Sequence, residues 1–213
     1  MRFGGAAFGL AAALAIGLAG GAQATTLADL SGGQSLTVGG LTFSDFTITV
    51  TGSALDPNLA DYKVLTLSDG FRIVGGFAAV DGEQGDMLVS YDVSVAAGSP
   101  AVNDIGLGFN GAAAGAHSAA SVSEDLSANG SPIASALVSQ TAGGLSQKVD
   151  TVTFAPETSF TVDKDILVKA GSPGLGTISF IDQHFSLVPE PGTLVLLGGG
   201  LVGLFSFGRR RSR

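Results

Sequence analysis

The stretch MLVSYDVSVA, residues 87–96, is the clearest guide to the fold of this chain. Apolar residues recur at every second position, and Ser90, Asp92 and Ser94 stand between them. A period of two places alternate side chains on opposite faces of a β-strand. The stretch therefore predicts a strand of an antiparallel sheet, half buried and half in water. Its core face consists of Met87, Val89, Tyr91, Val93 and Val95.

Shorter runs with the same alternation recur along the chain, separated by clusters of Gly, Asp, Asn and Ser. They cover residues 41–52, 65–73, 101–110, 135–140, 148–155, 159–169 and 176–188. No stretch between residues 25 and 188 has a sustained helical period, and 111–132 predicts either an irregular crossing or a weak strand at 119–124. Many short strands with frequent turns are typical of all-β proteins. We expect a single antiparallel β-sandwich or jelly-roll-like domain over residues 25–188.

Three local patterns make sharper predictions. The alternation slips at Ser44-Asp45, which predicts a β-bulge or a break between two short strands. A three-residue loop, Ser68-Asp69-Gly70, would pair Leu67 with Phe71 and Leu65 with Ile73, with Gly70 left-handed. Lys164 would share a face with apolar neighbours, so the strand is expected to bend or end near it. The residues expected in the core are Phe43, Phe46, Ile48, Leu67, Phe71, Ile73, Val89, Tyr91, Val93, Phe109, Val152, Phe154, Phe160, Ile166 and Phe180.

The charge of the central segment argues against polyanionic partners. The whole chain has 10 basic and 18 acidic residues and a net charge of −8. Residues 25–188 hold five of the basic residues and 17 of the acids, so their net charge is 5 − 17 = −12. Such a surface repels nucleic acid and anionic lipid. The chain has no cysteine, which excludes disulfides, thiolate chemistry and Cys-ligated metals.

The sequence offers few residues for catalysis or for a cofactor. His117 and His184 have no partner at ligand spacing, and nothing matches a nucleophile elbow, a phosphate loop or a zinc helix. We therefore expect a protein that is not an enzyme and holds no cofactor. The metal hypothesis is calcium, because calcium binds oxygen ligands on loops. The candidates are Asp81, Glu83 and Asp86 in one loop, and Asp56, Asn58 and Asp61 in another. Their spacing is not that of an EF-hand, and a solvated loop is the alternative.

Sugar binding and glycan hydrolysis are alternatives that the sequence leaves open. The chain has no tryptophan and two tyrosines, Tyr62 and Tyr91, of which Tyr91 is expected to face the core. This composition disfavours an aromatic platform but allows hydrogen bonds from loops to a polysaccharide. A pocket with two carboxylates about 5–10 Å apart would favour a glycosidase.

The first 24 residues have the pattern of a secretory signal peptide. Arg2 precedes an apolar run at 6–18, and Ala22 and Ala24 form a small-residue cleavage step. The run is shorter than the ~17–20 residues of a spanning helix. We expect cleavage before Thr25 and export of the protein.

The last 25 residues form a second unusual segment. Pro189, Glu190 and Pro191 precede an apolar run at 193–207, and basic residues follow it: Arg209, Arg210, Arg211 and Arg213. We expect a short transmembrane helix at about 193–208, with the arginines in the cytoplasm according to the positive-inside rule. The prolines keep the approach to it extended.

This segment closely resembles the PEP-CTERM sorting signal. The resemblance implies a protein of Gram-negative, exopolysaccharide-producing bacteria and an exosortase-type membrane protease that recognises Pro189-Glu190-Pro191 and cuts near it. The protein would be anchored transiently in the inner membrane and then reach the cell surface or extracellular matrix. A permanent C-terminal anchor is the alternative.

Together these features suggest a non-catalytic surface or matrix protein associated with exopolysaccharide or biofilm. A lectin-like polysaccharide-binding module or a glycan hydrolase is the alternative function.

Overall fold

The computed structural model describes residues 25–144 and 146–188. The predicted signal peptide with Ala22 and Ala24 lies outside the described residues. So do the Pro189-Glu190-Pro191 motif, the predicted transmembrane helix and the basic tail. Within the described ranges, no helix is long and apolar enough to cross a membrane.

The described chain consists almost entirely of strands. Its one α-helix, α1 (Leu27–Ser31), and one 3-10 helix, η1 (Leu59–Asp61), are short. The strands are β1 (Thr25–Thr26), β2 (Leu36–Val38), β3 (Leu41–Gly52), β4 (Lys63–Thr66), β5 (Gly70–Val80), β6 (Gln84–Val95), β7 (Ala101–Ala114), β8 (Ala119–Ala128), β9 (Ser131–Thr141), β10 (Ser146–Gln147), β11 (Val149–Glu157), β12 (Ser159–Lys169) and β13 (Leu175–Val188).

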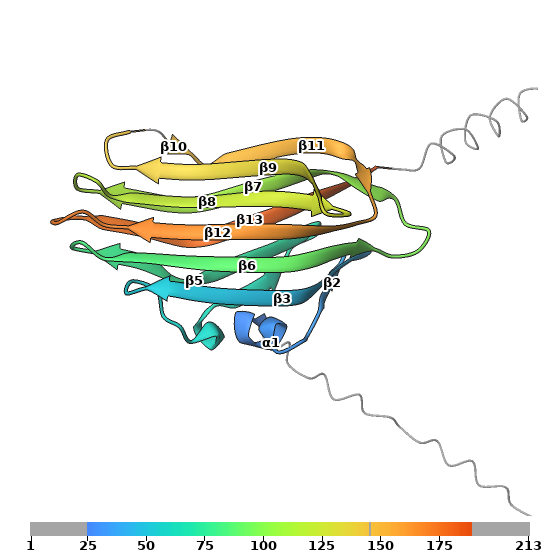
Figure 1. The fold of residues 1–213 in the computed structure, drawn as a ribbon, viewed down its shortest axis with the longest axis horizontal. Helices are drawn as coiled ribbons and strands as arrows, with labels where there is room; N and C mark the ends of the chain where they lie inside the picture. The colour runs from blue at the N-terminus through green and yellow to red at the C-terminus, as the bar shows by residue number, and fades with distance from the viewer. Residues whose placement is uncertain (1–24, 145, 189–213) are drawn as a thin grey trace, which may run out of the picture.

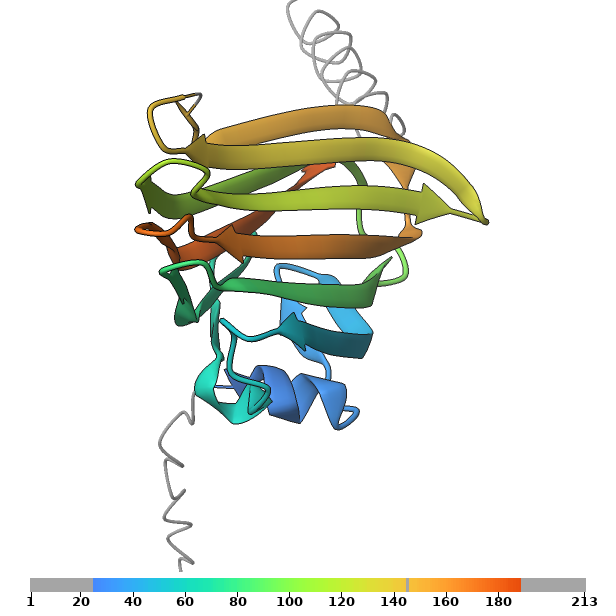
Figure 2. The same ribbon diagram turned by 60° about the vertical axis from the view of Figure 1, so that its left-hand side comes forward.

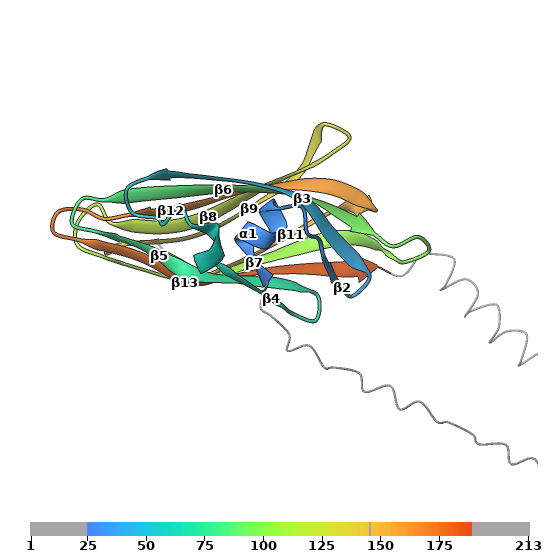
Figure 3. The same cartoon turned by 90° about the horizontal axis from the view of Figure 1, so that it is seen from below.

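The strands form two antiparallel sheets that pack face to face (Figures 1 and 2). The six-stranded sheet has the order β1-β4-β5-β13-β7-β11, and the seven-stranded sheet has the order β10-β9-β8-β12-β6-β3-β2. Viewed from below, α1 lies at the edge of the sandwich between the two layers (Figure 3). The prediction of an all-β antiparallel sandwich is confirmed.

The long strands are joined as nested antiparallel pairs. β5 pairs with β13, β6 with β12, β7 with β11 and β8 with β9, so the outermost pair joins strands far apart in the sequence. The two members of each pair lie in the same sheet, and from β5 to β8 the chain changes sheet at every strand. This arrangement is that of a jelly roll.

The core lies between the sheets and follows the predicted alternation. In β6, Met87, Val89, Tyr91 and Val93 are buried, while Leu88 is half exposed on the outer face. Aromatic rings bridge the layers, since Phe43 packs on Phe71 with ring centroids 5.1 Å apart. Edge-to-face rings at this distance stabilise a core beyond the area they bury.

Most residues predicted to be in the core are buried there. The exceptions are Ile48, Val152 and Phe154, which are partly buried against the core, and Leu67 and Phe180, which are only partly buried. Phe180 lies on the outer face of β13, beneath the guanidinium of Arg72. The stretch 111–132, for which the sequence predicted either an irregular crossing or a weak strand at 119–124, contains the end of β7 and the regular strand β8.

The slip at Ser44-Asp45 is a β-bulge, as predicted. The register between β3 and β6 shifts between Ser44 and Thr47, and Asp45 has a φ of 57°. The extra residue moves the apolar positions to the other phase, so that Phe43 and Phe46 both reach the core.

The predicted hairpin register is wrong. Thr66 pairs with Phe71 and Val64 with Ile73, and Leu65 is exposed. The N–H of Leu67 donates to the carbonyl of Gly70 at 2.9 Å, so only Ser68 and Asp69 form the loop. The reason is that Tyr62 and Val64 are the inward residues of this edge segment, which places Leu65 outside. Gly70 is not left-handed. It is close to β13, where a Cβ would overlap the carbonyl group of Gln183.

The predicted bend at Lys164 is also wrong. β12 runs without interruption from Ser159 to Lys169, and Lys164 points into the core with 1% of its surface exposed. The strand stays straight because Lys164 has polar partners inside the sandwich, Glu124 and Gln183.

Candidate functional site

A groove of about 280 Å³ runs along the outer face of the six-stranded sheet. Its floor is formed by Gly106 and Gly108 of β7, at outward positions where the absence of a side chain lowers the surface. Gly106 pairs with His184 and Gly108 with Asp182 on β13, and on the other side they face Thr151 and Val149 of β11. Glycine inside a strand often marks a place where a ligand approaches the backbone closely. Asp104 and Ser186 complete the polar lining.

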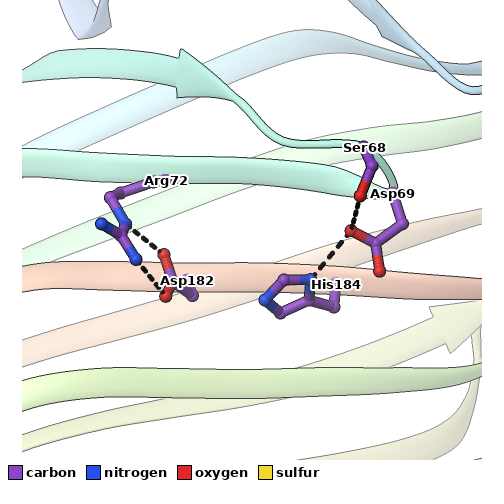
Figure 4. A network of polar contacts seen from close by, with 5 residues as sticks. All are labelled: Ser68, Asp69, Arg72, Asp182 and His184. Carbon is purple, nitrogen blue, oxygen red and sulfur yellow. Dashed lines mark hydrogen bonds and ion pairs between the residues drawn. The ribbon is translucent and has the colours of Figure 1, made fainter.

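One wall of the groove is held by an ion pair between β5 and β13. Arg72 donates from Nε and Nη2 to the two carboxylate oxygens of Asp182, at 2.6 and 2.8 Å (Figure 4). The guanidinium carbon lies 3.9 Å from the centre of the Phe180 ring. The hydrogen bonds to Asp182 raise the pKa of Arg72. Bidentate pairing fixes the Asp182 carboxylate at the rim of the groove.

His184 is held in a similar way at the next outward position of β13. Its Nδ1 lies 3.0 Å from Oδ1 of Asp69, and the Ser68 hydroxyl donates to the same oxygen (Figure 4). The other ring nitrogen of His184 points away from Asp69 (Figure 4). The imidazole is therefore oriented and can offer a second hydrogen bond to a ligand in the groove.

A larger groove of about 500 Å³ lies on the outer face of the seven-stranded sheet. Its lining is acidic and hydroxyl-rich. Asp125 and Asp163 are directly paired across β8 and β12, where the Cβ atoms of neighbours are ~5 Å apart. The pKa of Asp165 is raised by burial and by the charge and hydrogen bond of Asp86. The remaining lining includes Thr47, Thr49, Leu88, Ser90 and Ser123.

The structure does not bring the calcium candidates together. Asp81 accepts a hydrogen bond from the backbone N–H of Gly174, and Glu83 accepts one from that of Val80. Asp86 lies on β6 beside Asp165. Within residues 25–144 and 146–188, no three His, Asp or Glu side chains are grouped to hold a metal ion. The calcium hypothesis gains no support from this loop.

The remaining candidates of the sequence have structural surroundings. Tyr62 is buried and donates its hydroxyl proton to the carbonyl of Asp56, so it offers no platform to a sugar. His117 lies in the turn between β7 and β8 with a φ of 64°. The groove over Gly106 and Gly108 was missed. Two glycines at alternate outward positions of one strand are the sequence feature that could have predicted it. The ion pair of Arg72 and Asp182 could not be predicted in this way, because the two residues are 110 positions apart in the sequence.

Comparisons with known proteins identify the C-terminal segment. No curated protein sequence matches the chain. Among solved structures, TmCBM61 in complex with beta-1,4-galactotriose is 15% identical, with a TM-score of 0.36, and the match covers 66% of this chain and 88% of that one. CsCBM6-3 from Clostridium stercorarium in complex with cellobiose is 11% identical, with a TM-score of 0.24 and coverages of 66% and 94%. Residues 187–212 match the PEP-CTERM protein-sorting motif, so the chain is a protein that carries this sorting motif.

Proposed function

We propose that this chain is an exported, non-catalytic surface or matrix protein that an exosortase sorts and whose sandwich associates with exopolysaccharide. The observation that carries the proposal is the sorting motif at residues 187–212, which begins within β13 and follows the folded domain directly. The recognition sequence of the protease would therefore lie directly after the last strand of the domain.

The groove over Gly106 and Gly108 supports the association with a polysaccharide. Asp104, Asp182, His184 and Ser186 offer acceptors and donors for sugar hydroxyls along one side of a shallow track. The Phe180 ring is covered by Arg72, so stacking contributes little and each contact is weak. Many copies of the protein at a cell surface can bind one repeating polymer, and this multivalency would compensate for weak single contacts. The acidic surface favours a neutral or cationic polymer over an anionic one.

Mass spectrometry of the protein from its native host tests the sorting. We expect an N-terminus at Thr25 and a C-terminus near Pro189-Glu190-Pro191, without the four terminal arginines. Surface-exposed protein that keeps its tail through Arg213 would show a permanent anchor instead.

A pull-down with the polysaccharide of the producing strain, with and without calcium, tests the binding. The informative variant is Gly108→Ala, because its Cβ would meet Asp182 Cβ at an ordinary 3.6 Å and so fill the floor without a clash. We expect severalfold weaker binding with unchanged or slightly higher stability, since alanine costs less entropy than glycine in a strand. Gly76→Ala is the matched control, because a Cβ there meets nothing within 4 Å. Equal binding by both variants would exclude this groove.

A glycan hydrolase in the acidic groove is the second candidate function. The specific observation is the proximity of Asp163 and Asp125 to Asp165, whose raised pKa suits a proton donor. Release of reducing sugar by the wild type, abolished in Asp163→Asn, would establish it. We expect no release.

A further inference from the structure

Three polar side chains meet in the core between the two sheets. Lys164 of β12 and Glu124 of β8 are direct cross-strand partners in the seven-stranded sheet, and Gln183 of β13 reaches them from the opposite sheet. Their exposed fractions are 1%, 1% and 0%. The ammonium nitrogen of Lys164 contacts Glu124 Oε1 and donates to Gln183 Oε1 at 2.8 Å. An amine, a carboxyl group and a carboxamide are thus collected at one point.

The surroundings of this cluster are apolar. The strand neighbours directly beside the three residues are Val89, Ala136, Phe71 and Leu107, all buried. Burial lowers the pKa of Lys164, against the opposing effect of Glu124. A desolvated lysine loses its proton more easily and becomes a nucleophile.

The hydrogen bonding of the cluster is incomplete for a structural ion pair. Glu124 Oε2, Gln183 Nε2 and the nearby Tyr91 hydroxyl have no hydrogen-bond partner among the described residues. Each unpaired buried polar atom costs ~1–3 kcal/mol. Replacing a buried ion pair with apolar residues is often neutral or favourable. A buried pair with unpaired polar atoms is therefore a poor device for stability alone, which suggests another role for the cluster.

We propose that Lys164 and Gln183 react to form an intramolecular amide cross-link, with Glu124 as the proton carrier. The lone pair of the neutral amine attacks Cδ of Gln183 while Glu124 takes a proton from Nζ. Glu124 then protonates Nε2 of the tetrahedral intermediate, the Cδ–Nε2 bond breaks and ammonia leaves. One amide replaces another, so the reaction needs no oxidant, nucleotide or metal. The fold supplies the proximity that such reactions require.

The cross-link would tie the two sheets of a chain that contains no cysteine. Lys164 belongs to the seven-stranded sheet and Gln183 to the six-stranded sheet. It would close a loop between residues 19 positions apart, 183 − 164. It would have the role that a disulfide has in other exported proteins, and it would withstand reducing agents.

The intact mass of the purified protein tests this directly, with both termini assigned from terminal peptides. We expect a mass lower than the sequence mass by one ammonia molecule. Trypsin should leave residues 149–169 uncut after Lys164 and joined to the peptide that contains Gln183. A mass equal to the sequence mass would overturn the proposal, and so would the loss of one water molecule, which would place the bond at Glu124.

Two variants assign the roles. Glu124→Gln keeps the size of the side chain and removes its proton-transfer capacity, so we expect the full mass and no joined peptides. Lys148→Met is the matched control, because Lys148 is a partly buried lysine that contacts the carbonyl of Gly111 instead. This variant should still lose one ammonia. If Glu124→Gln fails to fold, the wild-type mass and peptide map still decide the proposal.

Discussion

At the scale of single residues, the acidic outer face of the seven-stranded sheet carries repulsion that the fold tolerates. Asp86 and Asp165 lie beside each other on β6 and β12, and each has a buried oxygen with no partner among the described residues. Asp125 faces Asp163 directly across the strands. Like charges placed directly opposite each other destabilise a sheet.

Asp165→Asn should therefore stabilise the protein at neutral pH. The pKa of Asp165 is raised in the folded state, so this group carries no penalty below about pH 3.8 and destabilises the wild type as the pH rises through the raised pKa. The variant does not titrate there. We expect a gain of up to ~1 kcal/mol at pH 7, the size of an exposed charge interaction, and no gain below about pH 3.8.

Thermal unfolding at pH 3 and pH 7 measures this effect. Asp92→Asn is the control, because Asp92 already accepts a hydrogen bond from Thr161 at 2.7 Å. A gain that is the same at both pH values would show that the charge of Asp165 is not its cause.

At the scale of secondary-structure elements, alternation was enough to predict the strands but not their partners. The pattern in β6 shows which side chains are buried, whatever strand lies beside it. The partner of Lys164 is Glu124, which lies 40 residues away on β8. Because the sequence of β12 alone does not show this partner, a lysine on its apolar face predicted a bend or an end of the strand. The predicted register of the hairpin before β5 was wrong for a similar reason. The two possible registers differ in whether Val64 or Leu65 faces the core, and the contacts that decide this lie outside the hairpin.

The cluster of Lys164, Glu124 and Gln183 on β12, β8 and β13 allows an energetic test that complements the mass measurement. The double variant Lys164→Met with Glu124→Leu replaces the buried pair with apolar residues of similar size. For an ordinary ion pair, the free energy of unfolding should stay the same or rise by ~1–4 kcal/mol. For a cross-link, it should fall by ~3 kcal/mol, the chain-entropy contribution of a loop of about this length.

Urea unfolding of the wild type and the double variant distinguishes the two cases. The dependence of the free energy of unfolding on urea concentration gives a second criterion. A cross-linked wild type exposes less surface on unfolding, so its slope should be smaller than that of the variant.

At the scale of the whole molecule, β13 completes both the six-stranded sheet and the core. It lies between β5 and β7 and contributes Ile178, Ile181 and Phe185 to the core. A chain that ends at Gly174 lacks this strand, so β5 and β7 each keep one neighbour and expose the other edge, and exposed edges favour aggregation. We expect no cooperative unfolding transition from it by circular dichroism, whereas a chain that ends at Val188 should unfold cooperatively. A cooperative transition in the shorter chain would show that the sheet closes without β13.

The nesting of the strand pairs has a consequence for the order of events in the cell. Synthesis delivers β5 long before β13, so β5 can pair with β4 early but cannot acquire its second neighbour until the last described residues have been made. Contacts between such distant segments form slowly. The domain can therefore complete its sheet only after Val188 has been made, and the sorting motif at residues 187–212 begins at that point. Cleavage at the motif before β13 has paired would therefore release a domain that is complete in sequence but not yet folded.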